Sequence, residues 1–311
     1  MLTDILLLLV GLALIVFGAD WLVDGASAVA RRAGISEFVI GLTIVGFGTS
    51  CPELVVSLTG AFQGNADISI GNVVGSNTFN TLLILGLTAV LAPVAMTREN
   101  ARRDIPITLF VTLLFAATGY FTGQIGRAAG IVFLIVFAAY MYYCFKFDKG
   151  DEGDGAEGGK VKNVFVAVVL IIAGLAGLII GGQLFVDNAT SIAKVLGVSD
   201  KVIALTLLAG GTSFPELATC IVAAAKHKGQ LALGNILGSN VFNILLILGL
   251  SSIVTPLSTA SMTAFDYGVL ILGMSLLAVW ACTGKKNRID RWEGTVMLLA
   301  YAAYMCVLFI K

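Results

Sequence analysis

Charged residues are scarce in this chain. They account for 12% of its 311 residues, whereas hydrophobic residues account for 58% and the formal net charge is zero. Average proteins carry about 25% charged residues, so a soluble domain of this size would have far more polar surface. The lack of net charge gives no indication of a nucleic-acid partner. The composition therefore predicts a membrane protein.

Histidine and cysteine, the side chains that bind soft metals, are also rare. The only histidine, His227, stands between Lys226 and Lys228, where a solvent-exposed role is expected. The five cysteines are an odd number and lie in or beside apolar runs, which is typical of small buried hydrophobic residues. A Zn²⁺ or Cu⁺ site is therefore not expected. An intramembrane Ser/His or paired-aspartate protease is disfavoured as well, because neither pair occurs at membrane depth.

Apolar runs long enough to cross a bilayer follow one another along the whole chain. A spanning helix needs about 20 apolar residues. The sequence predicts an all-α membrane protein with ten transmembrane helices and almost no extramembrane domain. The predicted spans are 4–30, 36–62, 68–91, 104–122, 126–147, 163–195, 200–225, 230–254, 263–282 and 291–310.

Basic residues are distributed unevenly between the alternating loops. With the N-terminus outside, 15 of the 19 lysines and arginines fall on the cytoplasmic side, and only Arg127, Lys194, Lys201 and Lys311 fall outside. Cytoplasmic loops of membrane proteins carry such an excess. We therefore expect a multi-pass protein of the cell (inner) membrane with both termini outside.

The sequence matches itself when it is shifted by 163 positions. Without a gap, 18–87 aligns with 181–250, and 31 of the 70 residue pairs are identical. We divide the chain into a first five-helix repeat (1–145), a cytoplasmic linker (146–162) and a second repeat (163–311). Because five is odd, the second repeat is expected to enter the membrane inverted, as in many secondary transporters. The acidic residues of the linker lack the spacing of an EF-hand loop and predict a solvated segment.

Each repeat contains one span that should be broken beside a glutamate. Pro52 removes the backbone donor to the carbonyl of Gly48, and Glu53 follows at mid-span. The second repeat has the same arrangement at Pro215 and Glu216. Paired broken helices indicate a transporter binding site. Since no lysine or arginine shares this depth, a bound cation, a proton or water must compensate the carboxylates.

The polar residues near these breaks offer only oxygen ligands. Hydroxyl and amide side chains recur in both repeats, namely Thr49, Ser50, Asn72, Ser76, Asn77 and Asn80 and their counterparts Thr212, Ser213, Asn235, Ser239, Asn240 and Asn243. Carboxylate, hydroxyl and amide oxygens suit hard cations such as Ca²⁺, and Na⁺ accepts the same ligands. A channel is disfavoured because the broken helices are paired rather than arranged in a ring.

These motifs resemble the calcium/cation antiporter superfamily, in particular its prokaryotic sodium/calcium exchangers. The resemblance rests on 48–53 with 71–80 and on 211–216 with 234–243, and it extends over both halves of the chain. It implies that the protein is no enzyme and needs no cofactor, but exchanges Na⁺ for Ca²⁺ by alternating access. It further implies that the long first and sixth spans slide past the core, and that a monomer suffices.

The resemblance also implies a ligand set. The Ca²⁺ site would comprise Glu53, Glu216, Thr49 and Thr212. One flanking Na⁺ site would use Ser50, Ser76 and the Gly46 carbonyl, and the other would use Ser213, Ser239 and the Ala209 carbonyl. Asn80 and Asn243 would line the middle. Potassium-dependent relatives and some archaeal relatives carry an aspartate where this chain has Asn243.

A proton/calcium antiporter, or one for another divalent cation, is the alternative function. Such relatives usually carry an acidic residue directly after the Gly-Asn of the second motif. This chain has Val73 and Val74 in one repeat and Ile236 and Leu237 in the other, which favours Na⁺. Asp24 and Asp187 also correspond across the repeats, and for them we expect a polar role near helix ends rather than a ligand role.

Overall fold

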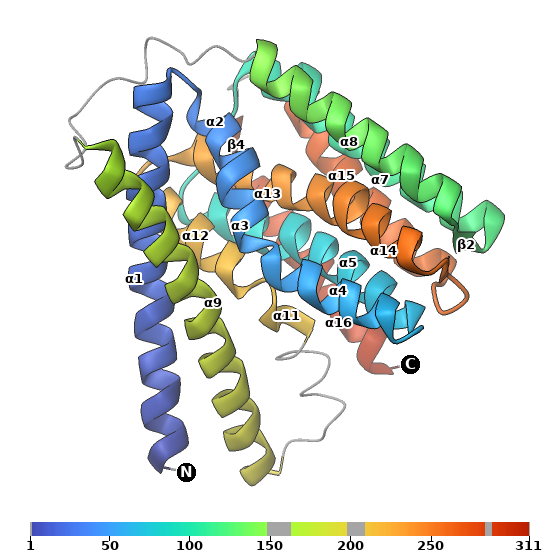
Figure 1. The fold of residues 1–311 in the computed structure, drawn as a ribbon, viewed down its shortest axis with the longest axis horizontal. Coiled ribbons are helices and arrows are strands. Elements are labelled where there is room, and N and C mark those ends of the chain that lie inside the picture. Colours follow the sequence, from blue (N-terminus) through green and yellow to red (C-terminus); the bar gives the residue numbers. More distant parts are fainter. Residues whose placement is uncertain (1, 148–162, 198–208, 284–287, 311) are drawn as a thin grey trace.

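A computed structural model describes residues 2–147, 163–197, 209–283 and 288–310. Figure 1 shows a bundle of helices. Among the described residues, two-residue strands form two short antiparallel pairs. The elements of the first half are α1 (Leu2–Ala33), α2 (Glu37–Ile40), η1 (Gly41–Val45), α3 (Gly46–Thr49), α4 (Cys51–Phe62), α5 (Ala66–Thr78), η2 (Phe79–Ile84), α6 (Leu85–Leu91), β1 (Val94–Ala95), η3 (Asn100–Asp104), α7 (Ile105–Thr122), β2 (Gln124–Ile125) and α8 (Arg127–Phe147). The η elements are π-helical turns.

The second half follows a similar order. Its described elements are α9 (Val164–Val195), α11 (Ala209–Gly211), α12 (Phe214–Ala225), α13 (Gly229–Val241), η5 (Phe242–Ile247), α14 (Leu248–Val254), β3 (Leu257–Ser258), α15 (Ala264–Thr283), β4 (Arg288–Ile289) and α16 (Arg291–Ile310). Several elements lie 163 positions after a first-half counterpart, among them η5 after η2 and β3 after β1.

Within the described residues, eight helices are long and apolar enough to cross a membrane. A ninth span results if the bent pair 37–49 and 51–62 is counted as one. These segments agree with nine of the predicted spans to within a few residues. The remaining one, 200–225, is described only from Ala209 onward, and most of the predicted linker lies outside the described residues.

The centre of the bundle is formed by two continuous segments, 66–91 and 229–254. Their apolar windows are 78% and 83% buried, compared with 22% for α8. The outer helices instead expose large side chains such as Phe17, Ile135 and Phe165, as expected for surfaces that face lipid. Many polar groups of the two central segments are therefore shielded from both water and lipid, among them Ser76, Asn80, Ser239 and Asn243.

The helix α1 crosses α9 along a line of glycines (Figure 1). A Cβ atom at Gly18 would come within 2.8 Å of the Gly174 carbonyl oxygen, and one at Gly11 within 2.8 Å of the Gly181 carbonyl oxygen. Small residues are needed here because the two backbones touch. The glycines lie seven residues apart in each helix, so the contact repeats along the crossing.

Short strands connect the two halves at opposite edges of the bundle. Antiparallel β1 pairs with β4, so that Val94 faces Ile289, and β2 pairs with β3, so that Ile125 faces Leu257. Each pair joins a loop of the first half to a loop of the second. The edge that contains β1 and β4 also receives the Gln230 side chain, whose Nε2 donates to the Ala95 carbonyl.

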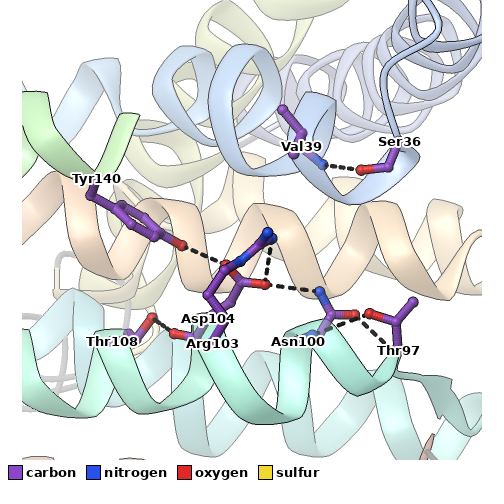
Figure 2. Close-up of polar contacts among 8 residues, drawn as sticks. All are labelled: Ser36, Val39, Thr97, Asn100, Arg103, Asp104, Thr108 and Tyr140. Carbon is purple, nitrogen blue, oxygen red and sulfur yellow. Dashed lines mark hydrogen bonds and ion pairs between the residues drawn. The ribbon is translucent and has the colours of Figure 1, made fainter. Parts of the chain in front are cut away.

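A buried carboxylate secures the beginning of α7 against α8 (Figure 2). Asp104 accepts hydrogen bonds from Arg103 Nε at 2.9 Å, from Asn100 Nδ2 at 3.2 Å and from the Tyr140 hydroxyl at 3.2 Å. Asn100 also closes a capping box with Thr97. Because this carboxylate is paired and hydrogen-bonded on all sides, it has a structural role rather than an open ligand position.

Candidate cation-binding site

Two helix breaks place two glutamates at the centre of the molecule. Pro52 stands in the first turn of α4 and Pro215 in the first turn of α12, and each is followed directly by a glutamate. The segment before α4 is bent by 48° relative to it. Glu53 and Glu216 are both fully buried. Each carboxylate therefore lies at a helix N-terminus, where the helix dipole favours negative charge.

Serine hydroxyls link each glutamate to both halves of the chain. Ser50 donates to Glu216 Oε1 at 3.0 Å, and Ser213 donates to Glu53 Oε1 at 3.0 Å. Within its own half, each glutamate also accepts from a serine of the following central segment, Ser76 at 3.5 Å or Ser239 at 3.3 Å. The four predicted serines thus converge on the two predicted glutamates, and two of the four bonds cross between the repeats.

The predicted threonines lie beside this group and contact amides. Thr49 donates to Asn235 Oδ1 at 3.2 Å, and Thr212 contacts Asn72 Oδ1 at 3.5 Å. Asn72 in turn donates to the Glu53 carbonyl at 3.2 Å. Thr49 is fully buried, whereas Thr212 is half-buried and lines a cavity. Asn72 thus connects Thr212 of the second break to Glu53 of the first, and Asn235 connects Thr49 to Cys220 of α12, to which its Nδ2 donates.

Four asparagines are hydrogen-bonded to one another between the two central segments. Asn243 Nδ2 donates to Asn77 Oδ1 at 2.8 Å, Asn80 Nδ2 donates to Asn240 Oδ1 at 3.4 Å, and Asn77 Nδ2 donates to the Asn240 carbonyl. Asn80 and Asn243 each stand second in a π-helical turn, η2 or η5. Such wide turns are frequent at functional sites. Here they bring the two predicted middle residues to equivalent positions.

The predicted backbone ligands are placed less evenly. The Gly46 carbonyl accepts from Ser239 and from Thr49, each at 3.4 Å, so it belongs to the hydrogen-bonded group around Glu216. Its counterpart Ala209 begins α11, directly after residues that the structure does not describe. The structure therefore brings together the predicted side chains and Gly46, and it places Ala209 at the start of the second break.

Four acceptor oxygens in this group have no hydrogen-bond donor. They are Glu53 Oε2, Glu216 Oε2, Asn80 Oδ1 and Asn243 Oδ1, and all four residues are fully buried. A buried acceptor without a partner costs about 1–3 kcal/mol, and more when it is charged. The four atoms form two pairs related by the 163-residue shift. A positively charged ligand would satisfy all of them, whereas an additional acceptor would not.

The ligand chemistry of these oxygens is that of a hard cation. Among the described residues, no group of three or more His, Cys, Asp or Glu side chains is placed to hold a metal ion. Beyond the two carboxylates, the oxygens gathered here are neutral hydroxyls, amides and carbonyls. Such mixtures suit Ca²⁺, and they are unsuited to ions that require thiolate or imidazole.

A cavity of about 410 Å³ reaches the site between α4, α9 and the second break. Its walls include Cys51 and Pro52 of the first break, Thr212 and Pro215 of the second, and Asp187 of α9. The α9 residues that line it belong to the C-terminal half of that helix, away from the linker. Neither glutamate lines the cavity, but it is lined by Pro52 and Pro215, the residues that directly precede them.

The family model described as sodium/calcium exchanger protein matches residues 3–146 and 166–310. The chain belongs to this family. Both matched segments include a helix break and a glutamate, so the family assignment and the site cover the same parts of the molecule. The family consists of exchangers rather than catalytic enzymes, and it lies within the calcium/cation antiporter superfamily that the motifs resemble.

Full-length relatives support this membership. The chain is 40% identical over 321 residues to "Putative antiporter CaxA" of Alkalimonas amylolytica, covering 99% of both chains. It is 37% identical over 346 residues to "Sodium/calcium exchanger MaX1" of Methanosarcina acetivorans, covering 98% of both. Its structure matches that of the sodium-calcium exchanger NCX_Mj soaked with Na⁺ and Ca²⁺, with a TM-score of 0.86, 34% identity and 98% coverage of both chains. The exchanger family therefore also accounts for the fold.

Some features of the site are not evident from the sequence. The crossing of Ser50 to Glu216 and of Ser213 to Glu53 requires the two breaks to face each other, which no local pattern reveals. The sequence predicts Asn77 and Asn240 only as oxygen ligands, yet they accept hydrogen bonds from the two middle asparagines, Asn243 and Asn80. Their identity at equivalent positions of both repeats was the available signal. Asp24, for which we expected a polar role near a helix end, is paired with Lys226.

Proposed function

We propose that this protein exchanges Na⁺ for Ca²⁺ across the cell membrane by alternating access. The observation that carries the proposal is the set of four buried acceptor oxygens without donors, contributed in equal pairs by the two repeats. Ions bind there to Glu53 and Glu216, with Thr49, Thr212 and the four serines completing the shell. Gly46 and Ala209 add carbonyl oxygens, and Asn80 and Asn243 line the middle.

The charge of the site limits what it holds. Glu53 and Glu216 supply two negative charges, which one Ca²⁺ or two Na⁺ neutralise. Because these ions share the same oxygens, Ca²⁺ and a full complement of Na⁺ exclude each other, which is the condition for exchange. A third Na⁺ would rest on neutral oxygens, and the cycle would then move one net positive charge.

The proposed architecture is a pair of inverted five-helix repeats, with ten spans in total. Supporting it are the self-match at a shift of 163 residues and the way β1 pairs with β4 while β2 pairs with β3. The excess of basic residues supports a cytoplasmic 146–162 linker and termini that both lie outside. A cysteine at Gly155 should then react with an impermeant thiol reagent only after intact cells are permeabilised.

The transport test uses purified protein in proteoliposomes. Vesicles loaded with Na⁺ and diluted into Na⁺-free medium should accumulate ⁴⁵Ca²⁺, and vesicles with equal Na⁺ on both sides should not. A pH gradient imposed without Na⁺ separates the alternative function. Uptake driven by protons and indifferent to Na⁺ would identify a proton/calcium antiporter and refute Na⁺ exchange.

A further inference from the structure

The candidate site can be approached from two sides, one toward the linker and one away from it, and we call these its two mouths. The two mouths are built differently. On the side away from the linker, Gln183 and Asp187 of α9 are exposed and line the cavity of about 410 Å³. A shift of 163 positions relates these residues to Asp20 and Asp24 of α1. Around Asp20 and Asp24, four counterparts of the cavity wall, Ala19, Val23, Thr49 and Thr219, are fully buried. Val16, Phe214 and Ala218, which are also counterparts of wall residues, line a separate apolar cavity of about 240 Å³ that neither aspartate lines. One mouth is therefore open and the other closed.

Lys226 is positioned to hold the closed mouth together. It follows the last residue of α12, and its Nζ lies 2.6 Å from Asp20 Oδ1 and 2.6 Å from Asp24 Oδ1. The same Nζ donates to the Asp20 backbone carbonyl at 3.3 Å. Three contacts thus attach the end of α12 to α1. Their partial exposure implies a modest energy for each pair, but the lysine serves two carboxylates at once.

Among the described residues, the open mouth has no cation at the position equivalent to Lys226. The counterpart of Lys226 is Gln63, and the counterpart of Asp20 is Gln183. Asp187 has no ion pair among the described residues. Both mouths therefore have an aspartate at one equivalent position, Asp24 or Asp187. They differ at the other two positions, where the closed mouth has Asp20 and Lys226 and the open mouth has glutamines. Burial alone would favour a neutral Lys226, but its hydrogen bonds to the two aspartates outweigh burial and raise its pKa, so the amine stays charged.

We propose that Lys226, held by Asp20 and Asp24, is an ionic latch that keeps the linker-side mouth closed. Movement of α1 away from α12 opens that mouth only when the lysine leaves both carboxylates. The latch therefore biases the empty protein toward the state in which the opposite mouth is open. The inference rests on the alternating access of the proposed function, which requires both mouths to open in turn.

The test compares the reactivity of two wall positions related by the shift. Thr219→Cys reports the closed mouth, and Val56→Cys reports the open one. Both are placed in a parent protein in which Cys51, Cys282 and Cys306 are serine, and the labelling of that parent is subtracted. Labelling by a polar thiol reagent is followed in detergent without Na⁺ or Ca²⁺, where the reagent reaches both mouths.

We compare the labelling rate at position 219 with the labelling rate at position 56. Lys226→Gln should raise the ratio of the first rate to the second by about threefold to tenfold, since partly exposed ion pairs contribute only modestly to the stability of the closed state. Lys226→Arg should leave the ratio as it is. The matched control is Lys228→Gln, which removes a neighbouring lysine that contacts Glu37 rather than α1. It too should leave the ratio unchanged.

An unchanged ratio in Lys226→Gln would overturn the proposal. It would do so even if the variant were less heat-stable than the parent protein. An equal rise in Lys228→Gln would overturn it as well, because any loosening of the turn would then suffice. Labelling requires no transport. A protein that fails to exchange Na⁺ for Ca²⁺ but shows the Lys226 effect would refute the proposed function and leave the latch standing.

Discussion

The two halves of the chain carry the same residues around the two glutamates and different residues at the two mouths. Ser50, Ser76 and Asn80 have identical counterparts at 213, 239 and 243, whereas Lys226 corresponds to Gln63. The hydrogen bonds give a reason, because Ser50 contacts Glu216 and Ser213 contacts Glu53. A residue that serves the other repeat cannot change without disturbing a site shared by both. Each mouth is open in only one state of the proposed transport cycle, so the residues of one mouth can differ from those of the other.

The largest effect should come from breaking the site itself. Glu53→Gln and Glu216→Gln each remove one of two buried charges, and we expect either to reduce Na⁺-driven ⁴⁵Ca²⁺ uptake at least about 100-fold, since each charge-assisted contact is worth about 1.5–3 kcal/mol. Equal losses are expected because the two glutamates have equivalent surroundings. The matched control is Glu99→Gln, an exposed glutamate, which should exchange normally. Full activity in either buried variant would refute the site.

The next effect concerns the crossing of α1 and α9, where glycines of the two halves meet. Gly18→Ala places a methyl group 2.8 Å from the Gly174 carbonyl oxygen and forces the helices apart. Overpacking of this kind costs about 1–3 kcal/mol, and we expect exchange to slow by about tenfold. Gly268→Ala in α15 is the control, since a Cβ atom there meets nothing within 4 Å. Equal rates in both variants would show that the close crossing is irrelevant to transport.

A smaller and more specific effect concerns potassium. Wild-type exchange should proceed unchanged when choline replaces K⁺, because two glutamates balance one Ca²⁺ and leave no charge for a co-bound K⁺. Asn243→Asp should add a K⁺ response by supplying a third carboxylate. Asn80→Asp, its counterpart, tests whether the two halves are equivalent in this respect. Loss of wild-type flux without K⁺, restored by adding K⁺ back, would contradict the charge count.

The smallest effect should come from a network that only the first half has. Tyr140→Phe removes the hydrogen bond to buried Asp104, and the positions equivalent to 104 and 140 in the second half are Tyr267 and Ala303. We expect a loss of about 1 kcal/mol in stability with unchanged exchange. Thermal unfolding in detergent measures it, with Tyr142→Phe as the exposed control. A large loss of transport would mean that Asp104 takes part in the cycle.

The sequence was most informative where a pattern repeats or a proline breaks it. Apolar length predicted the spans, and Pro52 and Pro215 predicted the breaks at which both glutamates are found buried. The sequence did not indicate which distant segments contact each other. Nothing local indicates that η2 and η5 are π-helical or that Lys226 meets Asp20, because these depend on how whole helices pack.

The crossed serines also bear on how the protein is made. Ser50 and Glu216 lie 166 positions apart, and Ser213 and Glu53 lie 160 apart. Ribosomes add about 5–20 residues per second, so the first glutamate waits roughly 10–30 s for its partner serine to be synthesised. During that interval the first half is in the membrane with an incomplete site and an uncovered α1 surface. The two halves therefore assemble only after the first half has entered the membrane. A chain truncated after the first half should be recognised by quality-control proteases.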